Sequence, residues 1–118
     1  MDQIYRGFEE SPEVRTVKRI GVIYSDVRRE YFPTEAQYIT EKDAGDDARI
    51  IGNYLEELGY GVLLHPGNSR LPAWLRKHRP DLIVNLVDSV KGTESLASAI
   101  PGVLELLELP YTGADILG

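Results

Sequence analysis

The sequence predicts one three-layer α/β domain, in which helices cover both faces of a Rossmann-like parallel sheet of about four strands. Two observations favour this fold class. Short, β-branched apolar runs are typical of strands buried on both faces, and helical segments separate them. These runs are Arg19–Tyr24, Gly61–Leu64 and Asp81–Val87. The order β-α-β-α-β-α-β then indicates parallel strands joined by helical crossovers.

The chain length agrees with one domain and a short extension. Its 118 residues lie in the commonest size range of single domains. Residues 1–17 are acidic and contain Ser11-Pro12, so we expect them to form an N-terminal arm, with a short edge strand at Val14–Val17. The α/β domain is expected over residues 18–118.

A long polar connection precedes the first helix. The segment Ser25–Lys42 is longer than most βα connections, and loops of such length are often functional. The clearest helix is Asp43–Leu58, because its apolar residues fall on one stripe. That stripe consists of Ala44, Ala48, Ile51, Leu55 and Leu58. Asp43 is expected to cap the start of this helix, and Gly59 to stop it.

The second half of the domain alternates in the same way. A short helix is expected over Leu71–Lys77, with Pro72 in its first turn. The stretch Glu94–Glu108 is expected to form two helical pieces, because Pro101 is tolerated only near the start of the second piece. The residues expected to face the core there are Val103, Leu104 and Leu107. Leu109–Thr112 is the expected fourth strand.

Composition and charge exclude several classes of protein. The net charge of −6 argues against a nucleic-acid partner. No apolar run approaches the roughly 20 residues that span a bilayer, and no signal-peptide pattern begins the chain. The absence of cysteine excludes disulfides and thiolate metal sites. We therefore expect a cytoplasmic protein with neither a nucleic-acid nor a membrane partner.

One basic cluster interrupts this acidic composition. It consists of Arg70, Arg76, Lys77 and Arg79. The last three fall at the end of the short predicted helix, where cations favour the helix dipole. An anion-binding site is the alternative interpretation of the cluster.

The fold class indicates where to look for a site. Ligands of open parallel sheets bind at the carboxyl ends of the strands. The segments of interest are therefore 24–42, 65–69, 88–95 and 112–118. The candidate substrate-binding residues are Ser25, Glu30, Asp88, Ser89 and Lys91.

Two of these candidates follow the third strand directly. A carboxylate at Asp88 can bind a cation or accept a proton; the alternative is that Asp88 caps the loop and pairs with Lys91. Ser89 is grouped with Thr93 and Ser95 near a helix start. Their hydroxyls can cap the helix, or its free N–H groups can hold a carboxylate. At least one acidic residue of the first loop is also expected to face the ligand crevice.

Neither a catalytic residue nor a metal site is predicted. Gly-x-Gly-x-x-Gly does not follow the first strand, and no glycine-rich loop ends in Gly-Lys-Ser/Thr. The two histidines, His65 and His78, stand at no ligand spacing to a carboxylate. We therefore expect no cofactor within this domain.

Three segments in the last third of the chain form a recognisable pattern. They are Val84-Asn85-Leu86 at a strand end, Pro101-Gly102-Val103-Leu104-Glu105-Leu106-Leu107, and Leu109-Pro110-Tyr111-Thr112-Gly113. This pattern resembles the N-terminal, pre-ATP-grasp domain of the D-alanine–D-alanine ligase family. The leucine-rich helix that runs into Pro-Tyr-Thr-Gly is its most specific part. Agreement in the order and spacing of elements extends the resemblance over residues 18–118.

The resemblance implies an ATP-dependent carboxylate–amine ligase. Such enzymes phosphorylate a carboxylate with ATP and magnesium, and an amine then attacks the acyl phosphate. D-alanine–D-alanine ligases serve peptidoglycan biosynthesis, and this domain helps them bind the first D-alanine. The domains that hold ATP and magnesium follow the Pro-Tyr-Thr-Gly turn and are missing from this chain, so the isolated domain is expected to be inactive. Its expected partners are an amino acid or similar small molecule and those missing domains of the same chain.

The sequence departs from the family pattern at three places. Family members carry a Gly-Gly-x-Ser-x-Glu type loop whose Glu meets the substrate ammonium; here Ser25-Asp26-Val27-Arg28-Arg29-Glu30 follows the first strand, and Glu30 is the candidate replacement. The usual His-Gly after the third strand is replaced by Asp88-Ser89. Glu108 stands where the helix usually ends in glycine, so a left-handed turn there would be strained. These departures concern the substrate D-alanine more than the relation to ATP-grasp ligases.

Other functions compete with this interpretation. The fold could close a core without further domains, so a stand-alone small-molecule-binding or partner-docking module is the main alternative. A receiver-like domain with Asp88 as phosphoacceptor is disfavoured, because such domains need an acidic pair after the first strand and only Asp26 is present. A domain that normally packs against others should expose an apolar patch, which predicts weak self-association, as a homodimer.

Overall fold

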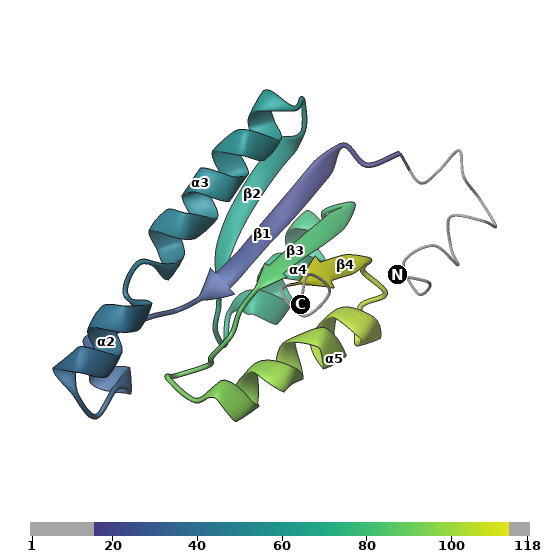
Figure 1. Cartoon of the computed structure of the whole chain (residues 1–118). Helices are drawn as coiled ribbons and strands as arrows, with labels where there is room; N and C mark the ends of the chain where they lie inside the picture. Colours follow the sequence, from purple (N-terminus) through teal and green to yellow (C-terminus); the bar gives the residue numbers. More distant parts are fainter. Residues whose placement is uncertain (1–15, 114–118) are drawn as a thin grey trace.

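A parallel sheet organises the structure, a computed structural model that describes residues 16–113. Its strand order is β2-β1-β3-β4, and all three pairings are parallel. The strands are β1 (Arg19–Ser25), β2 (Gly61–Gly67), β3 (Leu82–Leu86) and β4 (Tyr111–Gly113). The helices are η2 (Arg29–Tyr31), α2 (Glu35–Glu41), α3 (Ala44–Glu57), α4 (Leu71–His78), η3 (Glu94–Ser98) and α5 (Ala99–Leu106). The predicted three-layer α/β fold is therefore confirmed (Figure 1).

The two faces of the sheet carry separate parts of the core. Successive side chains of a strand point to opposite faces, so Val22 and Ile23, both fully buried, belong to different clusters. Val22 lies with Ala48 of α3 on one face. Ile23 lies with buried leucines of α4 and α5 on the other, among them Leu75 and Leu104. Helices on both faces leave the carboxyl ends of the strands as the open edge of the sheet.

The connection after β1 holds more structure than the sequence pattern predicts. Within Ser25–Lys42, a 3₁₀ turn (η2) and the helix α2 are formed. Thr34 caps α2, because its side chain accepts a hydrogen bond from the Gln37 N–H at 3.2 Å. Thr-x-x-Gln is the signature of a capping box, and it is the signal in the sequence that marks this helix. In Figure 1, α2 lies beyond the carboxyl end of β1.

Two expectations about α3 are wrong in detail. Asp43 precedes the helix but makes no capping hydrogen bond; its carboxylate pairs instead with Lys42 at 3.3 Å. Leu58, the last member of the predicted stripe, is 58% exposed. An i, i+7 spacing drifts by about 20° per step around a straight helix, which carries Leu58 to the margin of the buried stripe.

The second half follows the predicted order closely. Pro101 is the third residue of α5, and Leu104 is fully buried, with Val103 and Leu107 packed against its cluster. The chain then turns through Glu108, whose φ is 58°. The Leu109 N–H donates to the Leu104 carbonyl at 3.0 Å, which closes the helix. Leu109 is therefore engaged by the helix end, and β4 begins two residues later than predicted, at Tyr111.

Two further observations concern the termini and the membrane. Of the expected edge strand Val14–Val17, residues 14 and 15 lie outside the described residues, and residues 16 and 17 form no strand. Between residues 16 and 113, none of the helices combines the length and the apolarity that crossing a bilayer requires.

Candidate functional site

The strand order places a topological switch point between β1 and β3. From β1 the chain crosses to β2 on one side, whereas from β3 it crosses to β4 on the other side. The connections after β1 and β3 therefore diverge, and open α/β sheets bind ligands at such a switch point. Ser25 is the last residue of β1, and Asp88 and Ser89 follow β3.

A buried hydroxyl at this switch point joins the two connections. The Ser25 Oγ donates a hydrogen bond to Asp88 Oδ1 at 2.7 Å. The same oxygen accepts from the backbone N–H groups of Asp88, at 3.0 Å, and Ser89, at 3.3 Å. Ser25 and Ser89 are buried, at 2% and 5% exposure, whereas Asp88 is exposed. One donor and two accepting lone pairs are all that a serine hydroxyl offers, so Ser25 is fully used in holding this loop.

The end of β3 aims Asp88 out of the sheet. Buried Asn85 accepts the Val87 N–H on its side-chain Oδ1 at 3.0 Å. This local bond gives the backbone a turn in place of a further ladder bond, so β3 stops at Leu86. The Asp88 carboxylate then emerges one residue beyond the buried Val87.

Lys91 is fixed in a tight turn three residues later. Val90 and Thr93 exchange two backbone hydrogen bonds of 3.0 Å each, and φ is positive at both Lys91 (52°) and Gly92 (77°). These are the features of a type I′ turn. A Cβ at Gly92 would collide with the carbonyl oxygen of Tyr31, so this turn, Val90–Thr93, is packed tightly against the end of η2.

The suggested pairing of Asp88 with Lys91 is not observed. No ion pair in residues 16–113 joins them; those present are Arg28–Asp26, Arg29–Glu35 and Lys42–Asp43. The physical reason lies in their partners: Asp88 bonds to Ser25, and Lys91 occupies a left-handed corner of the turn that borders a separate cavity.

The cavity that Lys91 borders, called here the basic cavity, has a volume of about 370 Å³. Its charged lining consists of Arg28, Arg70, Lys91 and Asp26. Asp26 accepts from Arg28 at 3.2 Å and from the Asn68 side-chain amide at 3.2 Å. Asn68 also accepts the Arg70 N–H at 3.0 Å, which ties the cavity wall to the start of α4. In the part of the chain that the structure describes, Arg70 and Lys91 form no ion pair.

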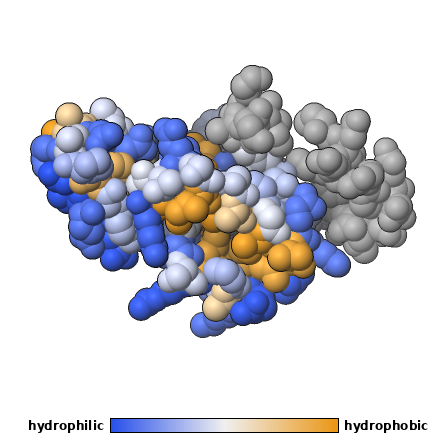
Figure 2. All heavy atoms as spheres, turned by 90° about the horizontal axis from the view of Figure 1, so that it is seen from below, coloured by the Kyte–Doolittle hydropathy of each residue, from blue (hydrophilic) through white to orange (hydrophobic). Residues whose placement is uncertain are grey.

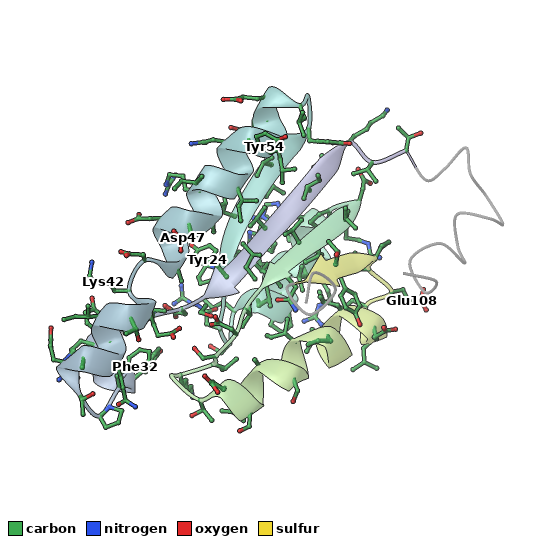
Figure 3. All side chains as sticks on the ribbon, in the orientation of Figure 1. Tyr24, Phe32, Lys42, Asp47, Tyr54 and Glu108 are labelled. Atoms are coloured by element: carbon green, nitrogen blue, oxygen red, sulfur yellow. The ribbon has the colours of Figure 1, made fainter. Side chains whose placement is uncertain are left out.

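A second cavity, called here the acidic cavity, lies on the other side of the loop. Its volume is about 600 Å³, and its charged lining residues are Glu41 and Glu94. Thr93 and Ser95 line it too, together with Ser89 and with Phe32, which Figure 3 places next to α2. Partial burial and the nearby carboxylates of Asp88 and Glu94 raise the pKa of Glu41. The acidic cavity therefore favours a cationic group.

The structure brings together four of the five predicted site residues. Ser25, Asp88 and Ser89 form one hydrogen-bonded group, and Lys91 stands a turn away in the basic cavity. Glu30 lies exposed in η2 and lines neither cavity. Sequence reasoning did not select Arg28, Asn68, Arg70 and Glu41 as site residues. Two of them carried a signal in the sequence. Arg70 belongs to the basic cluster and stands apart from its other three members, at the start of α4. Glu41 is one of the acidic residues in or near the first loop, of which at least one was expected to face the ligand crevice.

The histidines and carboxylates offer no metal centre in residues 16–113. No group of three or more histidine, aspartate or glutamate side chains there has a geometry that could hold an ion. His65 and His78 both lie against Trp74, with ring centroids 4.8 and 5.1 Å away. The donor set of the described residues therefore does not fit a magnesium–ATP complex.

Comparison with models of protein families, with curated proteins and with solved structures finds no match in any of the three.

Proposed function

We propose that this chain is the substrate-binding N-terminal domain of an ATP-dependent carboxylate–amine ligase that resembles D-alanine–D-alanine ligase, and that it is inactive alone. The segments that carry the resemblance are the end of β3, α5 and β4. The single observation that supports a substrate role most is the group of Ser25, Asp88 and Ser89 at the switch point, flanked by two cavities of opposite charge. We place the protein in the cytoplasm.

The residues around the switch point suit an amino acid or a similar zwitterion. Carboxylates such as Asp88 and Glu41 attract an ammonium group, and Lys91 and Arg70 attract a carboxylate. Ser25 has its hydrogen bonds satisfied within the protein, so its proposed role is to position Asp88 and Ser89. Under this proposal the domain binds and orients substrate, whereas ATP and magnesium are held by further domains of the same protein.

The coding sequence beyond Gly118 provides the first test. The proposal expects a reading frame of ordinary ligase size that continues into ATP-grasp domains. The encoded protein should then release ADP from ATP only when an amine and a carboxylate substrate are both supplied. Asp88→Asn in that protein should raise KM for the amino acid whose ammonium group this domain binds, and leave KM for ATP unchanged. A stop codon directly after Gly118 would contradict the proposal.

A stand-alone small-molecule-binding or partner-docking module is the second candidate function. Its support is that the sheet closes a core on both faces from residues 16–113 alone, with the two cavities at its open edge. Calorimetry of the 118-residue chain with D-alanine, other amino acids and ATP distinguishes this module from the ligase domain. Saturable binding of an amino acid without ATP, together with a reading frame that ends at Gly118, would favour the module.

A further inference from the structure

We propose that the basic cavity binds a small oxyanion, a carboxylate or phosphate group, which Arg70 and Lys91 hold. This inference deepens the proposed function and rests on it where Arg70 and Lys91 attract the carboxylate of a substrate. Its own support is the charges and geometry of the cavity, which apply equally to a ligase domain and to a stand-alone module.

The charge balance of the cavity is unusual for this protein. Three cations and one carboxylate line it, whereas the whole chain carries a net charge of −6. Arg28 already neutralises Asp26 at 3.2 Å. Arg70 and Lys91 remain without an ion-pair partner among the described residues. Two such cations on one concave surface repel each other and attract an anion, and a bound oxyanion offsets that repulsion.

The three cations come from segments that are separately held in place. Arg28 is held by Asp26, which Asn68 also contacts. The Arg70 backbone donates to the Asn68 side chain directly before α4. Lys91 sits at the corner of the Val90–Thr93 turn, whose Gly92 is packed against Tyr31. Because hydrogen bonds and packing hold the backbone near all three cations, binding of an anion costs less conformational entropy than binding by flexible loops would.

Size and polarity narrow the class of ligand. A volume of about 370 Å³ is at the lower end of the range for small-molecule sites. The lining includes Asn68, Ser69 and Tyr31 beside the charged groups, so hydrogen-bond donors and acceptors predominate. The cavity therefore fits a compact ligand that presents a carboxylate or a phosphate group.

Calorimetric titration of the 118-residue chain at low salt tests the proposal, with inorganic phosphate and succinate as probes. We expect saturable binding of at least one probe. Arg70→Gln and Lys91→Gln should each weaken it at least about tenfold, as expected when a charged hydrogen-bonding partner is lost. Lys91→Arg keeps the charge and should retain binding. Arg76→Gln and Lys77→Gln remove the same charge from the exposed last turn of α4 and should leave binding unchanged.

The outcomes separate the possible ligands and the two proposals. Binding of phosphate alone assigns a phosphorylated ligand, and binding of succinate alone assigns a carboxylate. Affinities that fall equally in Arg70→Gln and Arg76→Gln would mean unspecific attraction and would overturn the site, as would no binding by a chain that circular dichroism shows to be folded. A chain that binds these probes but has no ATP-grasp domains downstream would keep the oxyanion site and reject the ligase.

Discussion

The hydroxyl of Ser25 and the carboxylate of Asp88, 63 residues apart in the chain, form a hydrogen bond of 2.7 Å between the ends of two adjacent strands. The same hydroxyl accepts from the N–H groups of Asp88 and Ser89. One side chain thus fixes both the direction of the carboxylate and the path of the loop that leads to Lys91.

Ser25→Ala should lower the free energy of unfolding by about 1–3 kcal/mol, because it leaves the buried Ser89 N–H without a partner. Urea unfolding followed by circular dichroism measures the change. Ser98→Ala is the matched control, since its exposed hydroxyl bonds only to the Ser95 carbonyl at 3.0 Å; it should cost under about 0.5 kcal/mol. Equal effects of the two substitutions would contradict the role given to Ser25.

Glu108→Gly should stabilise the protein by about 1 kcal/mol. Glu108 ends α5 with φ at 58°, a conformation that strains residues with a Cβ and that glycine adopts freely. Its carboxylate points away from the sheet in Figure 3 and is exposed, so little packing is lost. Thermal unfolding measures the gain, and Glu105→Gly, inside the same helix, should instead destabilise. A Glu108→Gly variant that melts below the parent chain would refute this account.

Glu41→Gln should make stability less dependent on pH. Because burial and the carboxylates of Asp88 and Glu94 raise the pKa of Glu41 above its ordinary value of 4.5, the native state binds that proton more tightly than the unfolded chain does. Stability is therefore lost as pH rises from the ordinary value through the raised one. At pH 7 the variant should be more stable, by under about 1 kcal/mol because water screens the site.

The difference between Glu41→Gln and the parent should vanish as the pH falls below the ordinary range of glutamate. Denaturant unfolding at a series of pH values measures it. Glu56→Gln on the exposed side of α3 is the control and should show no such trend. A difference that grows toward low pH would have the wrong sign for a raised pKa.

Leu106→Gln should suppress self-association. Leu106 is 85% exposed at the end of α5, and Leu96 in the preceding η3 is 47% exposed. Figure 2 shows apolar atoms gathered on the side of the molecule where α5 lies. Sedimentation equilibrium should reveal weak dimerisation of the parent chain and a shift toward monomer in the variant, with the free energy of unfolding changed by under about 0.5 kcal/mol. A parent chain that stays strictly monomeric at high concentration would contradict the expected homodimer.

The fold class could be predicted from the sequence because each buried parallel strand and each crossover helix has its own local pattern of apolar residues. The runs around Val22, Leu63 and Ile83 needed no knowledge of their neighbours to be assigned to strands. The helix α2 was missed because a helix of seven residues is marginal by itself, and only its Thr34–Gln37 cap marks it.

The site was predictable only as far as the strand ends determine it. Ser25, Asp88 and Ser89 meet because the carboxyl ends of parallel strands lie at one edge. Whether Arg28 and Arg70 lie close to Lys91 depends on the backbone paths of three loops beyond that edge. Contacts between residues distant in the sequence determine those paths, such as the hydrogen bond from Asn68 to Asp26. A turn like Val90–Thr93 shows positive φ at a lysine, which composition does not reveal.

The Val90–Thr93 turn also separates two cavities of opposite sign. Lys91 borders the one lined by Arg28 and Arg70, and Thr93 borders the one lined by Glu41 and Glu94. The turn thus stands between the positive and negative poles of a local electric field. If the domain binds a dipolar ligand as proposed, this field would favour the orientation in which the anionic end of the ligand faces Lys91 and its cationic end faces Glu41.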